Sequence, residues 1–124
     1  MIDFKNASFV KLRPVSSAEL VRVVQPLFAS DEEVIQCFKG IRDFVVFTTK
    51  RIIAVNVQGI SGKKKDFTSL PYSKIQAFSV ETAGHFDLDA ELDLWFSGMG
   101  RIRFEFVARA NVSDICRMIS ELVL

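Results

Sequence analysis

The sequence predicts a mainly β fold: a partly open barrel of seven strands in two antiparallel sheets, capped by a C-terminal helix. Three observations predict it. Short segments rich in β-branched and aromatic residues alternate with turn signals between residues 31 and 109. Residues 111–124 instead show the period of an amphipathic helix. The length of 124 residues and the 49% of hydrophobic residues fit a single domain with a packed core.

Residues 1–30 are expected to form a short helical N-terminal extension. Ser16 and Glu19 have the spacing of a capping box, which marks a helix start. The apolar stripe that follows consists of Leu20, Val24, Leu27 and Phe28. Pro26 lacks a backbone N–H, so we expect the helix to end near it.

Seven strand segments follow, at 32–40, 43–49, 51–57, 65–72, 74–82, 87–96 and 101–108. The C-terminal helix is predicted over 111–124, with Asn111 as its N-cap and Asp114 three residues later. Its apolar face comprises Val112, Ile115, Ile119, Leu122 and Val123.

The last two strands alternate apolar and polar residues, so each has one core face and one outer face. A three-residue loop over 98–100 places Trp95 opposite Arg103, whereas a slip of two residues places Asp93 opposite Arg103. Loop economy favours the first register and charge favours the second. The sequence leaves the choice open.

An acidic row on the sixth strand segment is a candidate for acid–base chemistry or metal binding. It consists of Asp87, Asp89, Glu91 and Asp93. Alternate residues on one strand face lie about 7 Å apart, a separation at which carboxylates can act together. A flat strand face is no cleft, however, and Arg101 and Arg103 are neighbours. We interpret the row as a solvated face and expect no metal site.

Other catalytic parts are scarce. The single histidine, His85, falls in a predicted loop, and no nucleophile or zinc-protease motif is present. Cys37 and Cys116 are far apart in sequence and fit buried thiols in a reducing compartment. We therefore expect a protein that is not an enzyme and uses no cofactor.

The segments 43–49 and 51–57 predict a hairpin that is apolar on both faces. A turn at Thr49 and Lys50 pairs Phe47 with Ile52 and Val45 with Ala54. If Asn56 marks the outer face, those four side chains point outward. Exposing large apolar side chains is costly, so either the N-terminal helix or another subunit should cover them. With Trp95, the candidate oligomer surface is Val45, Phe47, Ile52, Ala54 and Trp95.

Charge and hydropathy exclude some classes of function. With 16 Lys and Arg against 15 Asp and Glu, the net charge is +1, and we expect no nucleic-acid partner. The N-terminus does not resemble a secretion signal, and no stretch approaches a membrane span of about 18 apolar residues. We therefore expect a cytoplasmic protein.

Three long stretches are specific enough to compare with known families: IRDFVVFTTKRIIAVNVQGISGKKKDF, LPYSKI and FSVETAGHFDLDAELDLWFSG. Together they resemble the bacterial pleckstrin-homology (PH) domain family, and the resemblance covers nearly the whole chain. It implies a PH-like fold, no catalytic residues and homo-oligomeric rings, for which a pentamer is one candidate. It names no ligand, because lipid or protein binding by PH domains at large is an analogy of fold.

Residues 59–65, GISGKKK, resemble a phosphate-binding loop but fail its pattern. Val57 stands where a P-loop has its first glycine, and Lys64 stands where it has a hydroxyl. The glycines fit a β-hairpin turn with solvated lysines. Alternate hairpins of a meander share an end, so five cations are expected around one mouth: Lys39, Arg42, Lys63, Lys64 and Lys65. Asp87 and Asp89 should return near this end and oppose an anion.

Three function classes follow. The preferred one is a non-catalytic assembly and protein-binding module built as a homo-oligomeric ring. The alternative is a peripheral binder of anionic lipid or a phosphorylated ligand through the five cations. An enzyme using the acidic row has only carboxylate spacing in its favour.

Overall fold

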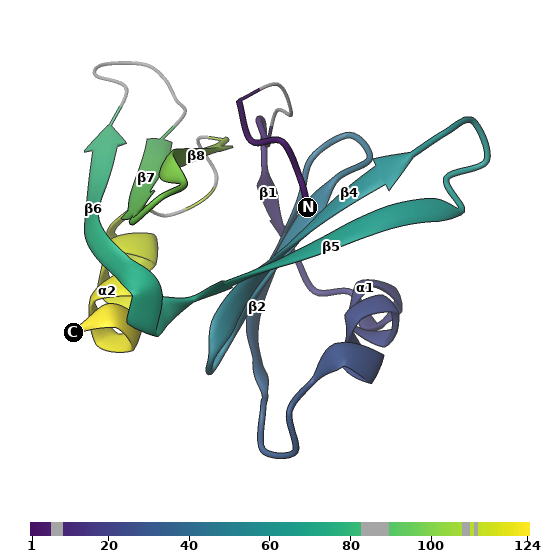
Figure 1. The fold of residues 1–124 in the computed structure, drawn as a ribbon, viewed down its shortest axis with the longest axis horizontal. Helices are drawn as coiled ribbons and strands as arrows, with labels where there is room; N and C mark the ends of the chain where they lie inside the picture. The colour runs from purple at the N-terminus through teal and green to yellow at the C-terminus, as the bar shows by residue number, and fades with distance from the viewer. Residues whose placement is uncertain (6–8, 83–89, 108–109, 111) are drawn as a thin grey trace.

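The computed structural model of the chain describes residues 1–5, 9–82, 90–107, 110 and 112–124. One sheet has the order β1 (Arg13–Val15), β2 (Val34–Lys39), β3 (Phe44–Thr48), β4 (Arg51–Gln58) and β5 (Lys64–Pro71). The other has the order β6 (Ile75–Thr82), β7 (Ala90–Phe96) and β8 (Gly100–Phe106). The helices are α1 (Ala18–Val24), the short 3-10 helices η1 (Gln25–Leu27) and η2 (Tyr72–Lys74), and α2 (Val112–Val123) (Figure 1). The predicted mainly β class with two antiparallel sheets and a C-terminal helix is confirmed, although the sheets do not close into a continuous barrel.

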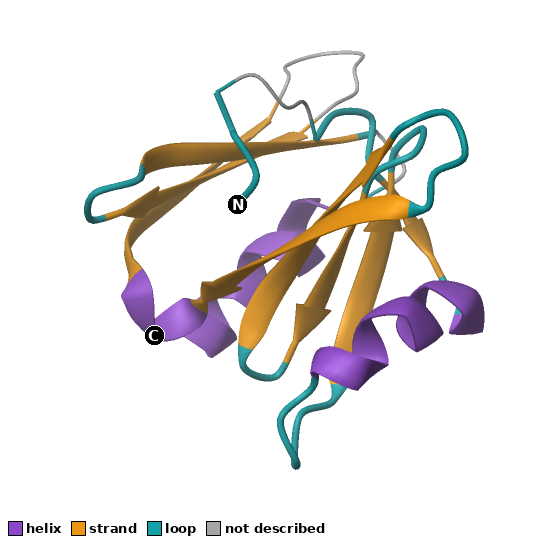
Figure 2. Cartoon of the chain, turned by 45° about the vertical axis from the view of Figure 1, so that its right-hand side comes forward, coloured by secondary structure: helices purple, strands orange, loops and turns teal. Residues whose placement is uncertain are grey.

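The seven predicted strand segments correspond to β2–β8, and the described residues add β1. Sequence analysis assigned residues 1–30 to a helical extension, but Arg13–Val15 pairs with β2 instead. Just before it, Leu12 bonds to β8 and to the residue that follows β8: its N–H donates to the Glu105 carbonyl at 3.0 Å, and its carbonyl accepts from the Val107 N–H at 2.9 Å. Residues 9–15 thus contact both sheets. Figure 2 shows the N-terminus between the two sheets, where Ile2 is buried.

Helix α1 begins one residue later than the capping box predicts. Ser17 is its N-cap, and the Ser17 hydroxyl accepts a hydrogen bond from the Leu20 N–H at 3.2 Å. Pro26 lies in η1, directly after α1, as its missing donor requires. Leu20 and Val24 are buried against the five-stranded sheet, so α1 covers one face of it.

The predicted pairing of the β3–β4 hairpin is confirmed, but the assignment of its faces was reversed. Val45, Phe47, Ile52 and Ala54 are fully buried in the main core with the three-stranded sheet. The opposite face packs against α1 through Phe44, Val46, Ile53 and Val55. Val45, Phe47, Ile52 and Ala54, which were predicted to lie on an oligomer surface, are therefore not on the surface of the folded chain.

The reversal has a physical cause at Asn56. This residue shares a face with Ile52 and Ala54, but it lies near the end of β4, beyond the packed core. There the Asn56 amide donates to Asp43 at 3.2 Å and its oxygen accepts from Gln58 at 2.8 Å. A polar residue at the end of a strand does not mark the outer face of the whole strand.

The last hairpin adopts the register that charge favours. Asp93 stands opposite Arg103 and Trp95 opposite Arg101, with residues 97–99 as the connection. This loop has three residues, as the loop over 98–100 would have, so loop economy does not in fact distinguish the two registers. The Arg103 guanidinium holds both oxygens of Asp93, at 2.7 and 2.9 Å. Such a two-point ion pair between directly opposed residues fixes the alignment of β7 and β8.

Helix α2 packs beside β6 and η2 and buries Ile115 and Ile119 in the main core (Figure 1). The predicted helix 111–124 is present as Val112–Val123. Its predicted N-cap, Asn111, lies outside the described residues. Cys116, expected as a buried thiol, is exposed on this helix, whereas Cys37 is buried as expected.

Candidate functional site: the basic loop end

Two turns meet at one end of the five-stranded sheet. They are the β2–β3 turn at residues 40–43 and the β4–β5 loop at residues 59–63. The Arg42 guanidinium donates to the carbonyl of Gly59. Asp43 accepts a hydrogen bond from the N–H of Val57 at 2.8 Å. The two connections thus form one surface, as expected for alternate hairpins of a meander.

The β4–β5 loop owes its shape to two glycines. Gly59 and Gly62 have φ values of +76° and +69°, in the left-handed region that strains other residues. A Cβ atom at Gly62 would lie 3.3 Å from Cγ1 of Val57. GISGKKK is therefore the glycine-dependent hairpin turn that the sequence indicates.

The five predicted cations lie around this surface in different environments. Lys63, Lys64 and Arg42 are exposed, whereas Lys39 and Lys65 are half-buried. Within the described residues, none of the five forms an ion pair. Asp87 and Asp89, expected to oppose an anion here, lie outside the described residues.

Sequence analysis missed two apolar side chains at the tips of the same turns. Ile41 is 86% exposed and Ile60 is fully exposed. Beside Ile41, a hollow of about 280 Å³ is lined by residues that include Phe9, Val10 and Leu12. The signal was present in the sequence: a large aliphatic residue at the centre of a turn lies outside the β alternation and has no strand face to bury it. We call Ile41 and Ile60 together with Lys39, Arg42, Lys63, Lys64 and Lys65 the basic loop end.

The other predicted surface is not assembled. Of its five members, Val45, Phe47, Ile52 and Ala54 are buried within the chain. Trp95 alone is half-exposed, on the outer face of the three-stranded sheet opposite Ala77 and Arg101.

The described part of the acidic row is held by one arginine. Asp93 is 5% exposed and bound by Arg103, which also lies 3.2 Å from Glu91. Hydrogen bonding to Asp93 raises the pKa of Arg103 and outweighs its partial desolvation. In the described ranges, no three His, Cys, Asp or Glu side chains converge into a group able to hold a metal ion. His85, Asp87 and Asp89 lie outside those ranges.

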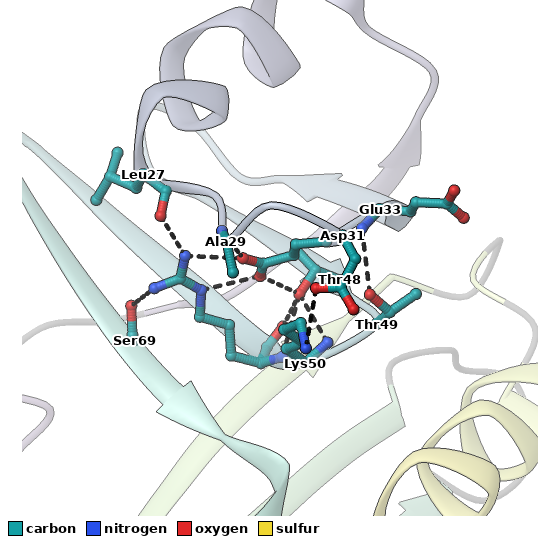
Figure 3. A network of polar contacts seen from close by, with 10 residues as sticks. Leu27, Ala29, Asp31, Glu33, Thr48, Thr49, Lys50 and Ser69 are labelled. Carbon is teal, nitrogen blue, oxygen red and sulfur yellow. Dashed lines mark hydrogen bonds and ion pairs between the residues drawn. The ribbon is translucent and has the colours of Figure 1, made fainter.

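At the opposite end of the sheet, a buried carboxylate joins η1 to the β3–β4 turn. Glu32 receives two hydrogen bonds of 2.9 Å from Arg51, one of 2.6 Å from the Thr48 hydroxyl and one of 2.9 Å from the Ala29 N–H. Figure 3 shows Leu27 and Ser69 beside this network, where both accept from Arg51. We call this network the Glu32 clamp.

The pKa shifts within the Glu32 clamp indicate a structural role. Burial raises the pKa of Glu32, but the hydrogen bonds from Arg51, Thr48 and Ala29 outweigh it and lower the pKa to about 2. Burial likewise raises the pKa of Tyr72, whose hydroxyl donates to the Thr48 carbonyl at 2.8 Å. All of these polar groups are used within the chain, so the clamp offers nothing to a ligand.

Comparison with known proteins supports the predicted family. The family model described as bacterial PH domain matches residues 3–123. The uncharacterized proteins YjqA and YozO of Bacillus subtilis are 40% and 31% identical, over 89% and 82% of this chain and 90% and 87% of their own. No helix in the described ranges has the length and apolar character to cross a bilayer.

Solved structures agree. A crystal structure of a DUF1696 family protein with a PH domain from Shewanella loihica is 38% identical and has a TM-score of 0.82, covering 93% of this chain and 99% of that one. The PH domain from Shewanella amazonensis is 40% identical with a TM-score of 0.68, covering 96% and 93%. The chain belongs to the bacterial PH domain family.

Proposed function

We propose that this bacterial PH domain is a non-catalytic module that attaches to anionic membrane surfaces through the basic loop end. The observation that carries the proposal is the exposure of Ile41 and Ile60 at the tips of two touching turns. Stable peripheral attachment needs two signals, an apolar group that enters the interface and a cationic patch that meets the headgroups. The basic loop end presents both on one surface.

The apolar and the cationic signal should contribute similar binding free energies. Fully burying an isoleucine side chain stabilises a complex by about 1.5–3 kcal/mol. Each lysine near an anionic leaflet adds about 1 kcal/mol. Neither the isoleucines nor the lysines alone would give firm attachment, so removal of either set should abolish most binding.

Vesicle co-sedimentation tests the proposal. We expect the protein to sediment with vesicles containing phosphatidylserine and not with pure phosphatidylcholine, and to be released by salt. The double variant Ile41→Ser/Ile60→Ser and the triple variant Lys63→Ala/Lys64→Ala/Lys65→Ala should each lose about a hundredfold in affinity, on the order of 3 kcal/mol. The control Ile35→Ser/Lys74→Ala removes an isoleucine and a lysine from other parts of the surface and should bind normally.

Two outcomes would contradict the bilayer as the ligand. One is equal sedimentation with neutral and anionic vesicles. The other is tight binding of soluble inositol hexakisphosphate that the lysine variant loses and the isoleucine variant keeps. The second result would assign the cations to a soluble phosphorylated ligand.

The absence of catalysis in this proposal is supported by the acidic side chains that already form ion pairs within the chain. Asp93 and Glu91 are engaged by Arg103, and Glu32 is enclosed in its clamp. A carboxylate that already accepts strong hydrogen bonds is a poor base and a poor metal ligand.

Self-assembly is a second candidate, favoured by Trp95. This residue is the only tryptophan in the chain and lies half-exposed beside the small side chain of Ala77. A partly exposed tryptophan on a sheet face is a common anchor of protein interfaces. The apolar hairpin no longer contributes to this candidate, because α1 and the second sheet cover it.

Light scattering and fluorescence test assembly together. An oligomer built on this face should have several times the 14.0 kDa mass of the chain. Its tryptophan emission should shift to longer wavelength on dilution, as Trp95 becomes hydrated. A mass of one chain at micromolar concentration, with emission independent of dilution, would contradict assembly.

A further inference from the structure

Strand β2 has an open backbone edge. Strand β1 pairs only with residues 37–39 of β2, because the chain turns away after Val15 so that Ser17 can cap α1. On that side of β2, residues 34–36 pair with no strand among the described residues. Unpaired N–H and C=O groups along a strand edge are a template for another extended chain.

Two hollows border this edge, one on either side. The hollow toward α2 has a volume of about 480 Å³, and the hollow toward α1 has a volume of about 520 Å³. Ile35 and Gln36 line both, so the hollows meet at the open edge. Figure 1 shows β2 running between the two helices.

The side chain of Ile35 is partly exposed where the two hollows meet. The β2–β3 register passes from Val34 opposite Thr48 to Gln36 opposite Phe47, which leaves Ile35 as the extra residue of a β-bulge. Its side chain is 41% exposed. Bulges are common where a side chain is redirected toward a binding surface, and here the redirected side chain is apolar.

The two hollows differ in charge. The one toward α2 is lined by the apolar residues Phe38, Ile115, Met118 and Leu122, together with Asp114, Arg117 and Glu121. The one toward α1 is lined by apolar residues that include Val15 and Val21 and by Ser16, Ser17 and Gln25, and its single charged lining residue is Arg22. Arg22 is exposed and has no ion pair within the described residues.

We propose that the open edge of β2 binds an extended peptide segment of another protein. The segment adds a strand antiparallel to β2, in line with β1. Since side chains of a strand alternate, one residue of the segment enters the hollow toward α2, which contains Phe38 and Ile115, and the next faces the hollow toward α1, which contains Arg22. The occupant is therefore an extended segment in which a large aliphatic or aromatic residue adjoins an acidic residue that meets Arg22. The backbone edge supplies affinity, and the two hollows supply specificity.

A library of random decapeptides displayed on phage and selected on the intact chain tests this proposal. We expect enriched peptides to carry an apolar residue next to Asp or Glu. A synthetic copy of the strongest binder, labelled with fluorescein, should lose at least about tenfold in affinity to Ile35→Lys and to Met118→Lys. Arg22→Glu should lose about as much for acidic peptides and should select basic ones. The control Ser79→Lys introduces a lysine at an exposed position of β6 that lines neither hollow, and it should bind normally.

Backbone pairing gives a sharper test. Within the part of the peptide that pairs with residues 34–36, methylation of single amides should weaken binding about tenfold at alternate positions and leave the positions between unaffected, because alternate amides face β2. Circular dichroism melting shows whether each variant is folded. Enrichment of no peptide, binding insensitive to Ile35→Lys, or methylation effects without alternation would overturn the proposal. Loss of an oligomer in Ile35→Lys would also overturn it, since the occupant would then be a second copy of the chain.

Discussion

The two ends of the five-stranded sheet use charge in opposite ways. At the Glu32 clamp, a buried carboxylate is satisfied by Arg51, Thr48 and a backbone N–H. At the basic loop end, Lys63 and Lys64 project into solvent with no ion pair among the described residues. The difference indicates that charge at the first end stabilises the fold, whereas charge at the second contributes little to folding and is free for binding.

The largest effect is expected at the clamp. Arg51→Met leaves the Glu32 carboxylate buried without its cation, which should lower the free energy of unfolding by about 3–5 kcal/mol. Urea denaturation measures it. The neighbouring variant Lys50→Met breaks only an exposed ion pair with Asp31 and should cost less than about 1 kcal/mol. Equal losses in the two variants would remove the distinction between a buried and an exposed pair.

The pH dependence of stability should show the same clamp. The folded-state pKa of Glu32, about 2, is below its ordinary value of 4.5, so ionised Glu32 stabilises the fold above pH 4.5. That stabilisation, on the order of 3 kcal/mol, is lost as the pH falls toward 2. Urea titrations at pH 6 and pH 2.5 should show a smaller loss in Glu32→Gln than in the unaltered chain. Parallel losses in both would mean that other carboxylates dominate acid unfolding.

A smaller effect is expected at a glycine of the basic loop end. Gly62→Ala forces a left-handed residue to carry a Cβ and brings that atom against Val57, so it should cost about 1–2 kcal/mol. Gly59→Ala has the same type of φ strain, but its Cβ would have no atom within 4 Å. It should therefore cost less than Gly62→Ala. The difference between the melting temperatures of the two variants separates the cost of the contact with Val57 from the cost of the left-handed backbone.

The smallest effect on stability is expected for the lysines. Together, Lys63→Ala, Lys64→Ala and Lys65→Ala should shift the free energy of unfolding by no more than about 0.5 kcal/mol each, since substitutions of solvated side chains rarely do more. The same variant should lose most vesicle binding. A large loss of stability would show that the loop cations support the fold after all.

Much of the fold follows from local patterns in the sequence. The register of β3 with β4 is set by the turn at Thr49 and Lys50, and the segments of β7 and β8 are set by strict alternation. The strand β1 was missed because three residues containing Pro14 give no periodic signal. Which face of the β3–β4 hairpin meets the second sheet was also beyond prediction, because both faces are apolar and only tertiary packing distinguishes them.

The candidate sites also differ in how far the sequence could predict them. The meeting of the β2–β3 turn and the β4–β5 loop follows from meander topology, so the grouping of Arg42 with the lysine loop was accessible from sequence. The Glu32 clamp was not, since Glu32 and Arg51 are 19 residues apart and nothing in either segment identifies the partner. Ile41 and Ile60 were visible as aliphatic residues in these two turns, but only the structure shows that both side chains are exposed.

The joining of residues 9–15 to both sheets has a consequence for synthesis of the chain. Phe9 and Leu12 are buried in the finished domain, yet their hydrogen-bond partners in that junction are Glu105 and Val107. At about 5–20 residues per second, a ribosome needs several seconds to deliver the second pair after the first. During that interval Phe9 and Leu12 lack these partners on the nascent chain, and a chaperone or a neighbouring nascent chain has its best opportunity to bind them.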